Sequence, residues 1–290
     1  MAETSDPAAW IANAAIPAFK CPMGTKMYIL DLGTLQVDDS WLLRGTNTSS
    51  VRNLNPENRR RDLMVLAALI EYPGVGLILF ETRYAEDIEL GAPITDIFPR
   101  TEYREEQRLP AAIEATGNNI KDVKVVIIGH LHLDHTGGLE HFIGTDIPIY
   151  AHEAELKHTC WAVGTGADFG VYIGHYIDLE KLNWQTFDES TLDLFQGISI
   201  HHLPGHTLGL CGLQINLKKD GTFIWTTDQF HIRENYEIGH PHVGLARDHN
   251  FWYRSLRLVQ RLQRIFDAKL IFGHDKDVGM GYKLAKEYYE

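Results

Sequence analysis

Short hydrophobic runs separated by polar or glycine-containing turns recur along the chain, and their lengths are typical of β-strands. The first run covers residues 25–33. Two further runs, residues 64–70 and 75–81, flank Tyr72-Pro73-Gly74, which favours a tight turn, so we expect them to form a hairpin. The remaining predicted strands are residues 123–128, 147–151, 198–203, 210–217, 222–227 and 268–272.

Helices are predicted between and after these runs. Hydrophobic residues recur at helical spacing over residues 251–266, and shorter helices are expected over 110–117, near 139–143 and over 152–161. Residues 82–108 lack a clear periodicity and are expected to cover the edge of a pocket. Strand-rich halves that each end in helices predict two sheets packed face to face with helices outside.

Composition adds few constraints to this pattern. No linker divides the chain, so we expect one domain over residues 1–290, with a short N-terminal arm (about 1–24) that packs on the body or on a second subunit of a homodimer. The formal charge of -12 disfavours nucleic acid as a partner. No hydrophobic stretch approaches the roughly 20 residues of a membrane span, and the acidic start is unlike a secretory signal. We therefore expect a soluble, cytoplasmic protein.

The densest chemistry in the sequence follows the hydrophobic run 123–128. His130, His132, Asp134 and His135 stand within six positions, and a glycine pair then allows the backbone to turn. Imidazole and carboxylate are common metal ligands, and at the end of a buried strand they can all face one point. The alternative is a set of hydrogen-bonded polar groups at a helix start, but the density of ligand-type residues favours a metal site.

Three more ligand-type residues stand where later predicted strands end. His206 lies in a Gly-His-Thr sequence, Asp228 follows two threonines, and His274 lies in a Gly-His-Asp sequence. Strand ends are common places for a site on a rigid scaffold. Each residue alone is more typical of a loop, and the three become informative only together with the earlier cluster.

This ordered set resembles the metallo-β-lactamase superfamily. The resemblance covers about residues 27–275 and rests on the motif His-x-His-x-Asp-His at 130–135, followed by the three later residues. It implies an α+β protein with an αββα sandwich, in which two mixed sheets carry helices on their outer faces. The implied ligands are His130, His132 and His206 for a first metal, Asp134, His135 and His274 for a second, and Asp228 as a bridge between them.

The resemblance also implies a reaction. Two Zn²⁺ ions are the expected cofactors, and iron, manganese and cobalt suit the same ligands. A hydroxide shared by the two metals would attack a substrate carbonyl. Asp134, beside that position, could orient the hydroxide and later protonate the leaving group, or act only as a ligand.

Within the superfamily, the sequence is most similar to the N-acyl-homoserine lactonase branch, on residues 130–138 and 272–275. This similarity implies a small lactone as substrate, with N-acyl homoserine lactones as one class. His231 stands where that branch typically has a tyrosine that contacts the substrate carbonyl, and Glu81-Thr82-Arg83 stands where it commonly has Asp-Thr-Gly. The predicted catalytic residues are Asp134 and His231, and the predicted substrate contacts are Leu133, Phe169, Tyr172, Phe230 and His231.

Several alternatives stay open at this stage. The same site could open a γ-lactam or a cyclic carbamate. A glyoxalase II-like thioesterase usually has a further histidine where this chain has Leu131, and a mononuclear iron persulfide dioxygenase would keep only one metal. The aromatic residues over 169–176 could line the pocket, form a dimer contact or cover the core. His240, His242 and His249 lie in a loop that could reach the pocket, and they are expected to be mostly structural.

Overall fold

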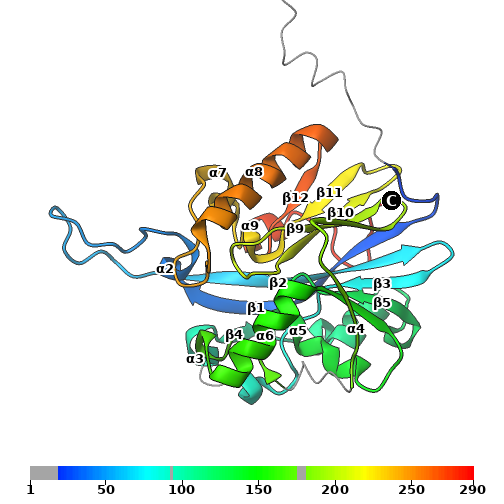
Figure 1. Ribbon diagram of the computed structural model, residues 1–290, viewed down its shortest axis with the longest axis horizontal. Helices are drawn as coiled ribbons and strands as arrows, with labels where there is room; N and C mark the ends of the chain where they lie inside the picture. The colour runs from blue at the N-terminus through cyan, green and yellow to red at the C-terminus, as the bar shows by residue number, and fades with distance from the viewer. Residues whose placement is uncertain (1–18, 92–93, 175–180) are drawn as a thin grey trace, which may run out of the picture.

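The computed structural model describes residues 19–91, 94–174 and 181–290, and in these residues two β-sheets pack face to face (Figure 1). The larger sheet has the strand order β4-β1-β2-β3-β5-β6-β7, and the smaller has the order β12-β11-β10-β9-β8. The strands are β1 (Lys26–Asp38), β2 (Arg60–Tyr72), β3 (Gly76–Phe80), β4 (Arg100–Glu102), β5 (Val123–Ile127), β6 (Pro148–His152), β7 (Asn183–Phe187), β8 (Thr191–Phe195), β9 (Ile198–His202), β10 (Cys211–Asn216), β11 (Thr222–Trp225) and β12 (Lys269–Ile271).

Helices cover the outer faces of both sheets. In Figure 1, α4, α5 and α6 lie against the larger sheet, and α7 and α8 lie over the smaller one. Both sheets are mixed, because β3, β5, β6 and β7 run parallel within the larger sheet and β11 pairs parallel with β12 in the smaller. The predicted α+β sandwich is therefore confirmed. The helices are α2 (Asp39–Leu42), α3 (Ile94–Ile97), α4 (Leu109–Glu114), α5 (Leu133–Thr136), α6 (Glu153–Thr165), α7 (Arg233–Ile238), α8 (His249–Phe266) and α9 (Lys276–Gly279).

The long strands β1 and β2 have hydrophobic side chains on both faces. Met27 and Ile29 point into the layer between the sheets, whereas Tyr28 and Leu30 point towards the helices beneath the larger sheet. This alternation follows from the two-residue period of a strand. Because both faces are buried, β1 continues to Asp38, beyond the predicted strand at residues 25–33.

Most of the predicted elements are present. Strands β2 and β3 form the expected antiparallel hairpin, and α8 covers the residues predicted as a long helix. The prediction missed β4, β7 and β8, which are short strands with few buried side chains. The glycine pair after the histidine cluster has a role other than turning, because a Cβ on Gly137 would lie 1.9 Å from the backbone nitrogen of Ala85.

Helix α8 attaches to the smaller sheet through one side only. Its buried residues Trp252, Leu256 and Val259 pack with Leu203 and Phe272. The side chain of Asp248 caps the helix by accepting a hydrogen bond from the backbone N–H of Phe251, which satisfies one of its free N–H groups. Trp252 Nε1–H donates to the carbonyl oxygen of Gln229 at 2.9 Å, which ties the helix to the loop that carries Asp228.

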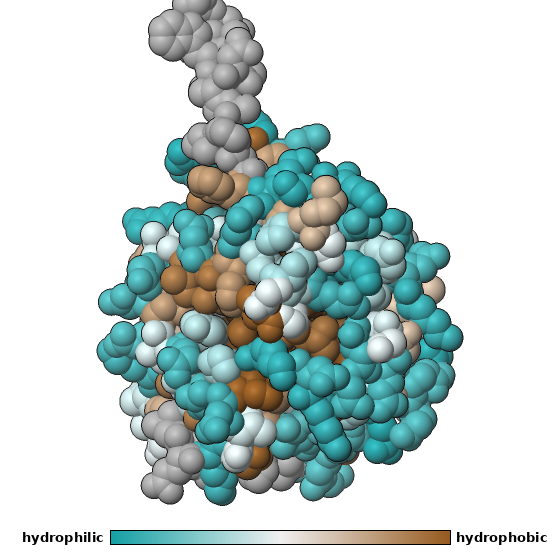
Figure 2. Space-filling view, turned by 90° about the vertical axis from the view of Figure 1, so that its right-hand side faces the viewer, coloured by the Kyte–Doolittle hydropathy of each residue, from teal (hydrophilic) through white to brown (hydrophobic). Residues whose placement is uncertain are grey.

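The surface is mostly hydrophilic on the side of the molecule that Figure 2 shows, with hydrophobic residues in a band at the height where the two layers meet. Among the helices of the described residues, none combines the length and the hydrophobicity that crossing a membrane requires. Residues 1–18 of the predicted N-terminal arm lie outside the described residues. That residues 1–290 form one domain stays a prediction.

Candidate metal centre

The loops that follow four strands meet at one edge of the sandwich and bring together all seven predicted ligand residues. His130 and His132 follow β5, and α5 carries the next two ligands of the motif. The other three follow β9, β11 and β12. Six of the seven are buried, and the side chain of Asp134 keeps 16% of its surface exposed.

One group of side chains surrounds a first point. His130, His132, His206 and Asp228 each place one nitrogen or oxygen within 4.8 Å of the others. His206 Nε2 lies 3.0 Å from His132 Nδ1, and Asp228 Oδ2 lies 3.5 Å from His206 Nε2 and 3.6 Å from His130 Nε2. Ligand atoms about 2.0–2.1 Å from a tetrahedral Zn²⁺ have this kind of mutual spacing.

A second group shares Asp228 with the first. Asp134, His135, His274 and Asp228 again place one ligand atom each within 4.8 Å of one another. His274 Nε2 lies 3.0 Å from Asp228 Oδ1 and 3.4 Å from Asp134 Oδ2, and His135 Nε2 lies 3.5 Å from Asp228 Oδ2. Both carboxylate oxygens of Asp228 therefore face the ligand atoms of these two groups.

Several polar atoms of these groups lack a hydrogen-bond partner within the protein. Buried atoms without a hydrogen bond include both ring nitrogens of His130, Nε2 of His132, His135 and His274, and Oδ1 of Asp228. Buried polar groups without partners are rare because each costs free energy, so such a concentration indicates a missing binding partner. Imidazole and carboxylate donors suit Zn²⁺ and other transition metals. The residues therefore fit two metal ions.

Burial and neighbouring charges set the protonation of the ligands. Burial lowers the pKa of His130, His132 and His206 well below the ordinary value, so these rings are neutral and keep a lone pair for a metal. Burial acts in the same direction on His135, but the carboxylates of Glu81, Asp134 and Asp228 outweigh it and raise the pKa of His135.

Glu81 supports the second group from behind. Its carboxylate contacts His135 Nδ1 and accepts a hydrogen bond of 2.6 Å from the backbone N–H of Gly129. This contact orients the ring so that Nε2 faces the site. Gly129 has to be glycine, because a Cβ there would lie 2.3 Å from Glu81 Oε1. Glu81, the first residue of the segment that departs from the Asp-Thr-Gly pattern, therefore orients the predicted ligand His135.

Glu155 joins two ligand loops. Its carboxylate accepts hydrogen bonds from the backbone N–H of Leu131 at 3.0 Å, from Thr207 Oγ1 at 2.6 Å and from the backbone N–H of Gly209 at 3.0 Å. Burial raises the pKa of Glu155, and these hydrogen bonds to the carboxylate oppose the rise. The loop that carries His130 and His132 is thereby tied to the loop that carries His206.

Two further histidines lie beside the first group. His231 Nε2 lies 3.1 Å from Asp228 Oδ2, and His231 Nδ1 is hydrogen-bonded to His242 Nδ1 at 3.2 Å. His242 Nε2 is in turn hydrogen-bonded to His206 Nδ1 at 3.1 Å. His242 is fully buried, so the loop histidine that was expected to be structural contacts a predicted ligand directly.

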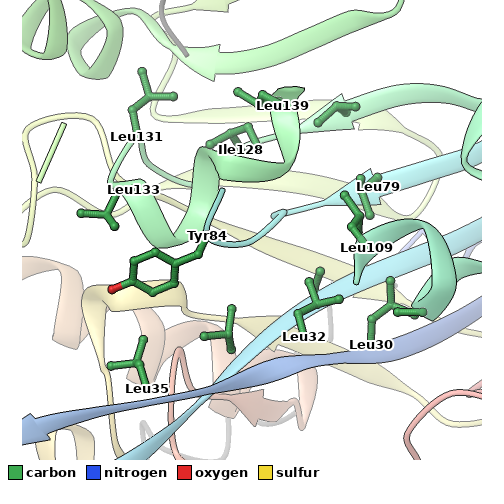
Figure 3. Packing of buried hydrophobic residues seen from close by; sticks show 14 of the residues in the cluster. Leu30, Leu32, Leu35, Leu79, Tyr84, Leu109, Ile128, Leu131, Leu133 and Leu139 are labelled. Carbon is green, nitrogen blue, oxygen red and sulfur yellow. The ribbon is translucent and has the colours of Figure 1, made fainter. Parts of the chain in front are cut away.

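A pocket opens over the two groups, and its walls are largely hydrophobic. Figure 3 shows Leu35, Tyr84 and Leu133 gathered around the end of α5, and all three line the pocket. Tyr84, Ile94 and Phe98 come from residues 82–108, as predicted for the pocket edge. The lining consists of Leu35, Leu63, Tyr84, Ile94, Phe98, His132, Leu133, Asp134, Val171, His206, Asp228, His231, Leu245 and His274.

Two of the predicted substrate contacts, Phe230 and Tyr172, are not among these lining residues. Phe230 is fully buried against Trp252, with ring centroids 5.6 Å apart, because the 3₁₀ turn at Thr227–Gln229 directs Asp228 and His231 to the site and Phe230 away from it. Tyr172 lies behind the ring of His132, and its hydroxyl donates to Glu155 at 3.4 Å. The side chain of Phe169 lies outside what the structure describes.

A two-sheet sandwich with histidines and aspartates gathered in the loops at one edge defines a class of metal-binding protein. Residues 86–274 match the model of the metallo-beta-lactamase superfamily, and the chain belongs to this superfamily. It is 25% identical over 272 residues to the N-acyl homoserine lactonase AiiB of Agrobacterium fabrum, which covers 88% of this chain and 95% of that protein.

Solved structures share the same fold. An N-acyl homoserine lactone hydrolase with the product N-hexanoyl-L-homoserine at its catalytic metal centre superposes with a TM-score of 0.76 and 23% identity, over 94% of this chain and 100% of that chain. AidC, a dizinc quorum-quenching lactonase, superposes with a TM-score of 0.64 and 15% identity, over 87% of this chain and 88% of that chain.

Proposed function

We propose that this protein is a dinuclear metal-dependent hydrolase that opens small lactones, with N-acyl homoserine lactones as one substrate class. The observation that carries the proposal is the pair of ligand groups joined by Asp228 at the base of a hydrophobic pocket. The N-acyl homoserine lactonases to which the chain is similar support the same reaction class.

The pocket has the character that such a substrate needs. A lactone with an acyl chain presents one polar ring and a long apolar tail. Hydrophobic side chains from β1, β2 and the segment around α3 form the walls, while the polar atoms gather at the base. An apolar tail on these walls would displace water and leave the ring carbonyl at the predicted ligands.

The chemistry divides between the metals and the chain. Two bound Zn²⁺ ions would act as Lewis acids towards the substrate carbonyl and the attacking water. Asp134, the partly exposed carboxylate among the predicted ligands, lines the pocket and is placed to transfer a proton to the leaving oxygen. His231 lines the same pocket, and its Nε2–H, 3.1 Å from Asp228 Oδ2, is placed to be shared between that carboxylate and the developing negative charge on the carbonyl oxygen.

A panel of purified substrates tests this proposal. The protein is loaded with Zn²⁺, and the hydrolysis products are quantified by chromatography with N-hexanoyl homoserine lactone, plain γ- and δ-lactones, a γ-lactam, an aromatic cyclic carbamate and a glutathione thioester. We expect lactone opening that disappears in Asp228→Asn, which keeps the side-chain shape but lacks the negative charge. Hydrolysis of the thioester alone, or oxygen consumption with one iron per chain, would overturn the proposal.

Cyclic amides are a second candidate, because two possible proton donors line the same pocket as Asp228. An amide nitrogen leaves only when it is protonated, so its release depends more strongly on a placed donor than that of a lactone oxygen does. Asp134 and His231 both meet this need by position. Faster turnover of the γ-lactam or cyclic carbamate than of any lactone in the same panel would favour this candidate.

A further inference from the structure

Three histidines form a continuous hydrogen-bonded row beneath the pocket. His242 stands in the middle, with Nδ1 3.2 Å from His231 Nδ1 and Nε2 3.1 Å from His206 Nδ1. All three rings are buried, and their centroids are 4.4 Å and 4.9 Å apart. The row therefore connects a predicted ligand of the first metal to His231, a pocket residue that is not among the predicted ligands.

The proton positions along this row can be deduced from the end at Asp228. His231 Nε2 lies 3.1 Å from Asp228 Oδ2, and an ionised carboxylate only accepts hydrogen bonds. A neutral His231 therefore carries its proton on Nε2 and accepts at Nδ1. A neutral imidazole has one donor and one acceptor nitrogen, so His242 donates from Nδ1 and accepts at Nε2, and His206 must then donate from Nδ1.

The same result follows from the opposite end. A metal ligand needs an unprotonated nitrogen, and His206 Nε2 faces the first group of ligand atoms, 3.0 Å from His132 Nδ1. His206 must then hold its proton on Nδ1, where His242 accepts it. Both ends of the row thus demand the same set of tautomers, and the opposite set would place a proton where the metal binds.

We propose that His242, which donates to His231 and accepts from His206, holds the proton of His206 on Nδ1 and so fixes Nε2 as the ring nitrogen with which His206 binds the first metal. This inference rests on the dinuclear site of the proposed function. It makes His242 a positioning residue, since its ring touches neither the pocket nor the second ligand group. It also gives His231 an influence on metal binding, although His231 is not among the predicted ligands.

The loop that carries His242 is held in place at several points. Asn235 Nδ2 donates to the carbonyl oxygen of His240 at 2.8 Å, and the backbone N–H groups of Arg247 and Asp248 donate to the carbonyl oxygen of Gly205, beside His206. The ring of His242 also packs edge-on against Trp252 at 6.2 Å. These contacts leave the ring little freedom to turn, so its hydrogen-bond direction is set by its two histidine neighbours.

The test measures Zn²⁺ binding rather than activity. The two Zn²⁺ affinities are determined by competition with a chromophoric chelator for the whole chain and its variants. We expect His242→Leu to weaken one of the two Zn²⁺ ions by about 10- to 100-fold, the usual effect of losing the partner of a ligand histidine, and to leave the other unchanged. His242→Gln should restore most of the affinity, because an amide offers one donor and one acceptor.

His231 provides the sharper arm of the test. His231→Leu removes the acceptor for His242 Nδ1–H, so it should weaken the same Zn²⁺ ion. The double variant of His231→Leu with His242→Leu should lose less affinity than the two single losses together, since both changes break one row, although His231→Leu also removes the contact with Asp228. His201→Leu is the matched control: His201 is buried with both ring nitrogens hydrogen-bonded, to Thr191 and Gln214, away from the ligands.

Additive losses in the double variant would overturn the inference, as would Zn²⁺ binding by His242→Leu that equals that of the unaltered protein. Thermal unfolding with chelator present identifies a variant that has lost its fold. If His242→Leu is such a variant, the inference is decided by the Zn²⁺ affinities of His242→Gln and His231→Leu: the first should stay near that of the unaltered protein, and the second should fall. Because Zn²⁺ is the only probe, a protein that shows this binding pattern but opens no lactone would refute the lactonase proposal and leave this inference intact.

Discussion

Replacement of Glu155 by glutamine is expected to destabilise the protein, although the two side chains have nearly the same shape. Oε1 of Glu155 accepts from the backbone N–H of Leu131, and Oε2 accepts from the backbone N–H of Gly209 and from Thr207. A carboxylate satisfies all of these donors. An amide cannot, because whichever way it is turned, its NH₂ group faces one of the two backbone N–H groups.

The magnitude follows from that mismatch. A buried donor left without an acceptor costs about 1–3 kcal/mol, and the remaining hydrogen bonds lose the strengthening that a charged acceptor gives. We therefore expect Glu155→Gln to lower the free energy of unfolding by about 2–4 kcal/mol. The loop of His130 and His132 would also lose part of its tie to the loop of His206, so the affinity for the first Zn²⁺ should fall as well.

Urea unfolding followed by tryptophan fluorescence measures this loss, with chelator present so that metal binding does not mask it. Glu153→Gln is the control on the same helical turn, since Glu153 pairs with Lys157 at the surface and its replacement should leave the free energy of unfolding nearly unchanged. A loss below about 1 kcal/mol for Glu155→Gln would show that the carboxyl group is already protonated in the folded protein, which refutes the reasoning.

Three other predictions follow from the same contacts. Removal of metal should lower the melting temperature because it leaves buried ligand atoms unpaired, and Zn²⁺ at about 100 times its Kd should restore about 2.7 kcal/mol; a melting temperature that ignores Zn²⁺ contradicts the metal site. At saturating Zn²⁺, Asp228→Asn should abolish lactone hydrolysis while His231→Leu lowers kcat by about 10²–10³-fold, and equal rates for His231→Leu and the unaltered enzyme would exclude His231 from catalysis. Burial, with His202 stacked alongside, lowers the pKa of His152 to about 4 from an ordinary 6.5, so the unfolded chain takes up the proton first as pH falls and stability is lost between pH 6.5 and 4. His152→Asn preserves a cap for α6 and should reduce this loss of unfolding free energy by on the order of 1–2 kcal/mol, as measured by urea titrations at both pH values. An unchanged pH dependence would rule out His152 as the source of the loss.

The sequence predicted the central strands because their hydrophobic runs are buried on both faces. Strand β5, for example, lies between β3 and β6 and is hydrophobic except for Lys124. The edge strands β7 and β8 escaped prediction because their exposed positions carry polar residues, and five residues are too few for the alternation to stand out. Their place depends on neighbours that only the fold supplies.

The predicted ligands could be identified from the sequence because four lie within six residues and the others follow recognisable strands. Glu81, Glu155 and His242 gave no comparable signal. A single glutamate in a sequence is usually a surface residue. Glu81 and Glu155 are buried instead, and their hydrogen-bond partners come from remote segments: Gly129 lies 48 residues after Glu81, and Gly209 lies 54 residues after Glu155. His242 likewise meets His206 from 36 residues away.

These remote contacts make the predicted ligand histidines chemically unequal. His135 has the carboxylate of Glu81 at Nδ1, His206 has the ring of His242, and His274 has the backbone carbonyl oxygen of Met64 at 3.0 Å. A carboxylate raises the basicity of the ligand ring most, and a carbonyl oxygen mainly orients the ring. An imidazole orients the ring only while its own tautomer is fixed. Of these three outer partners, the imidazole of His242 is the one hydrogen-bonded to a side chain that lines the pocket, that of His231.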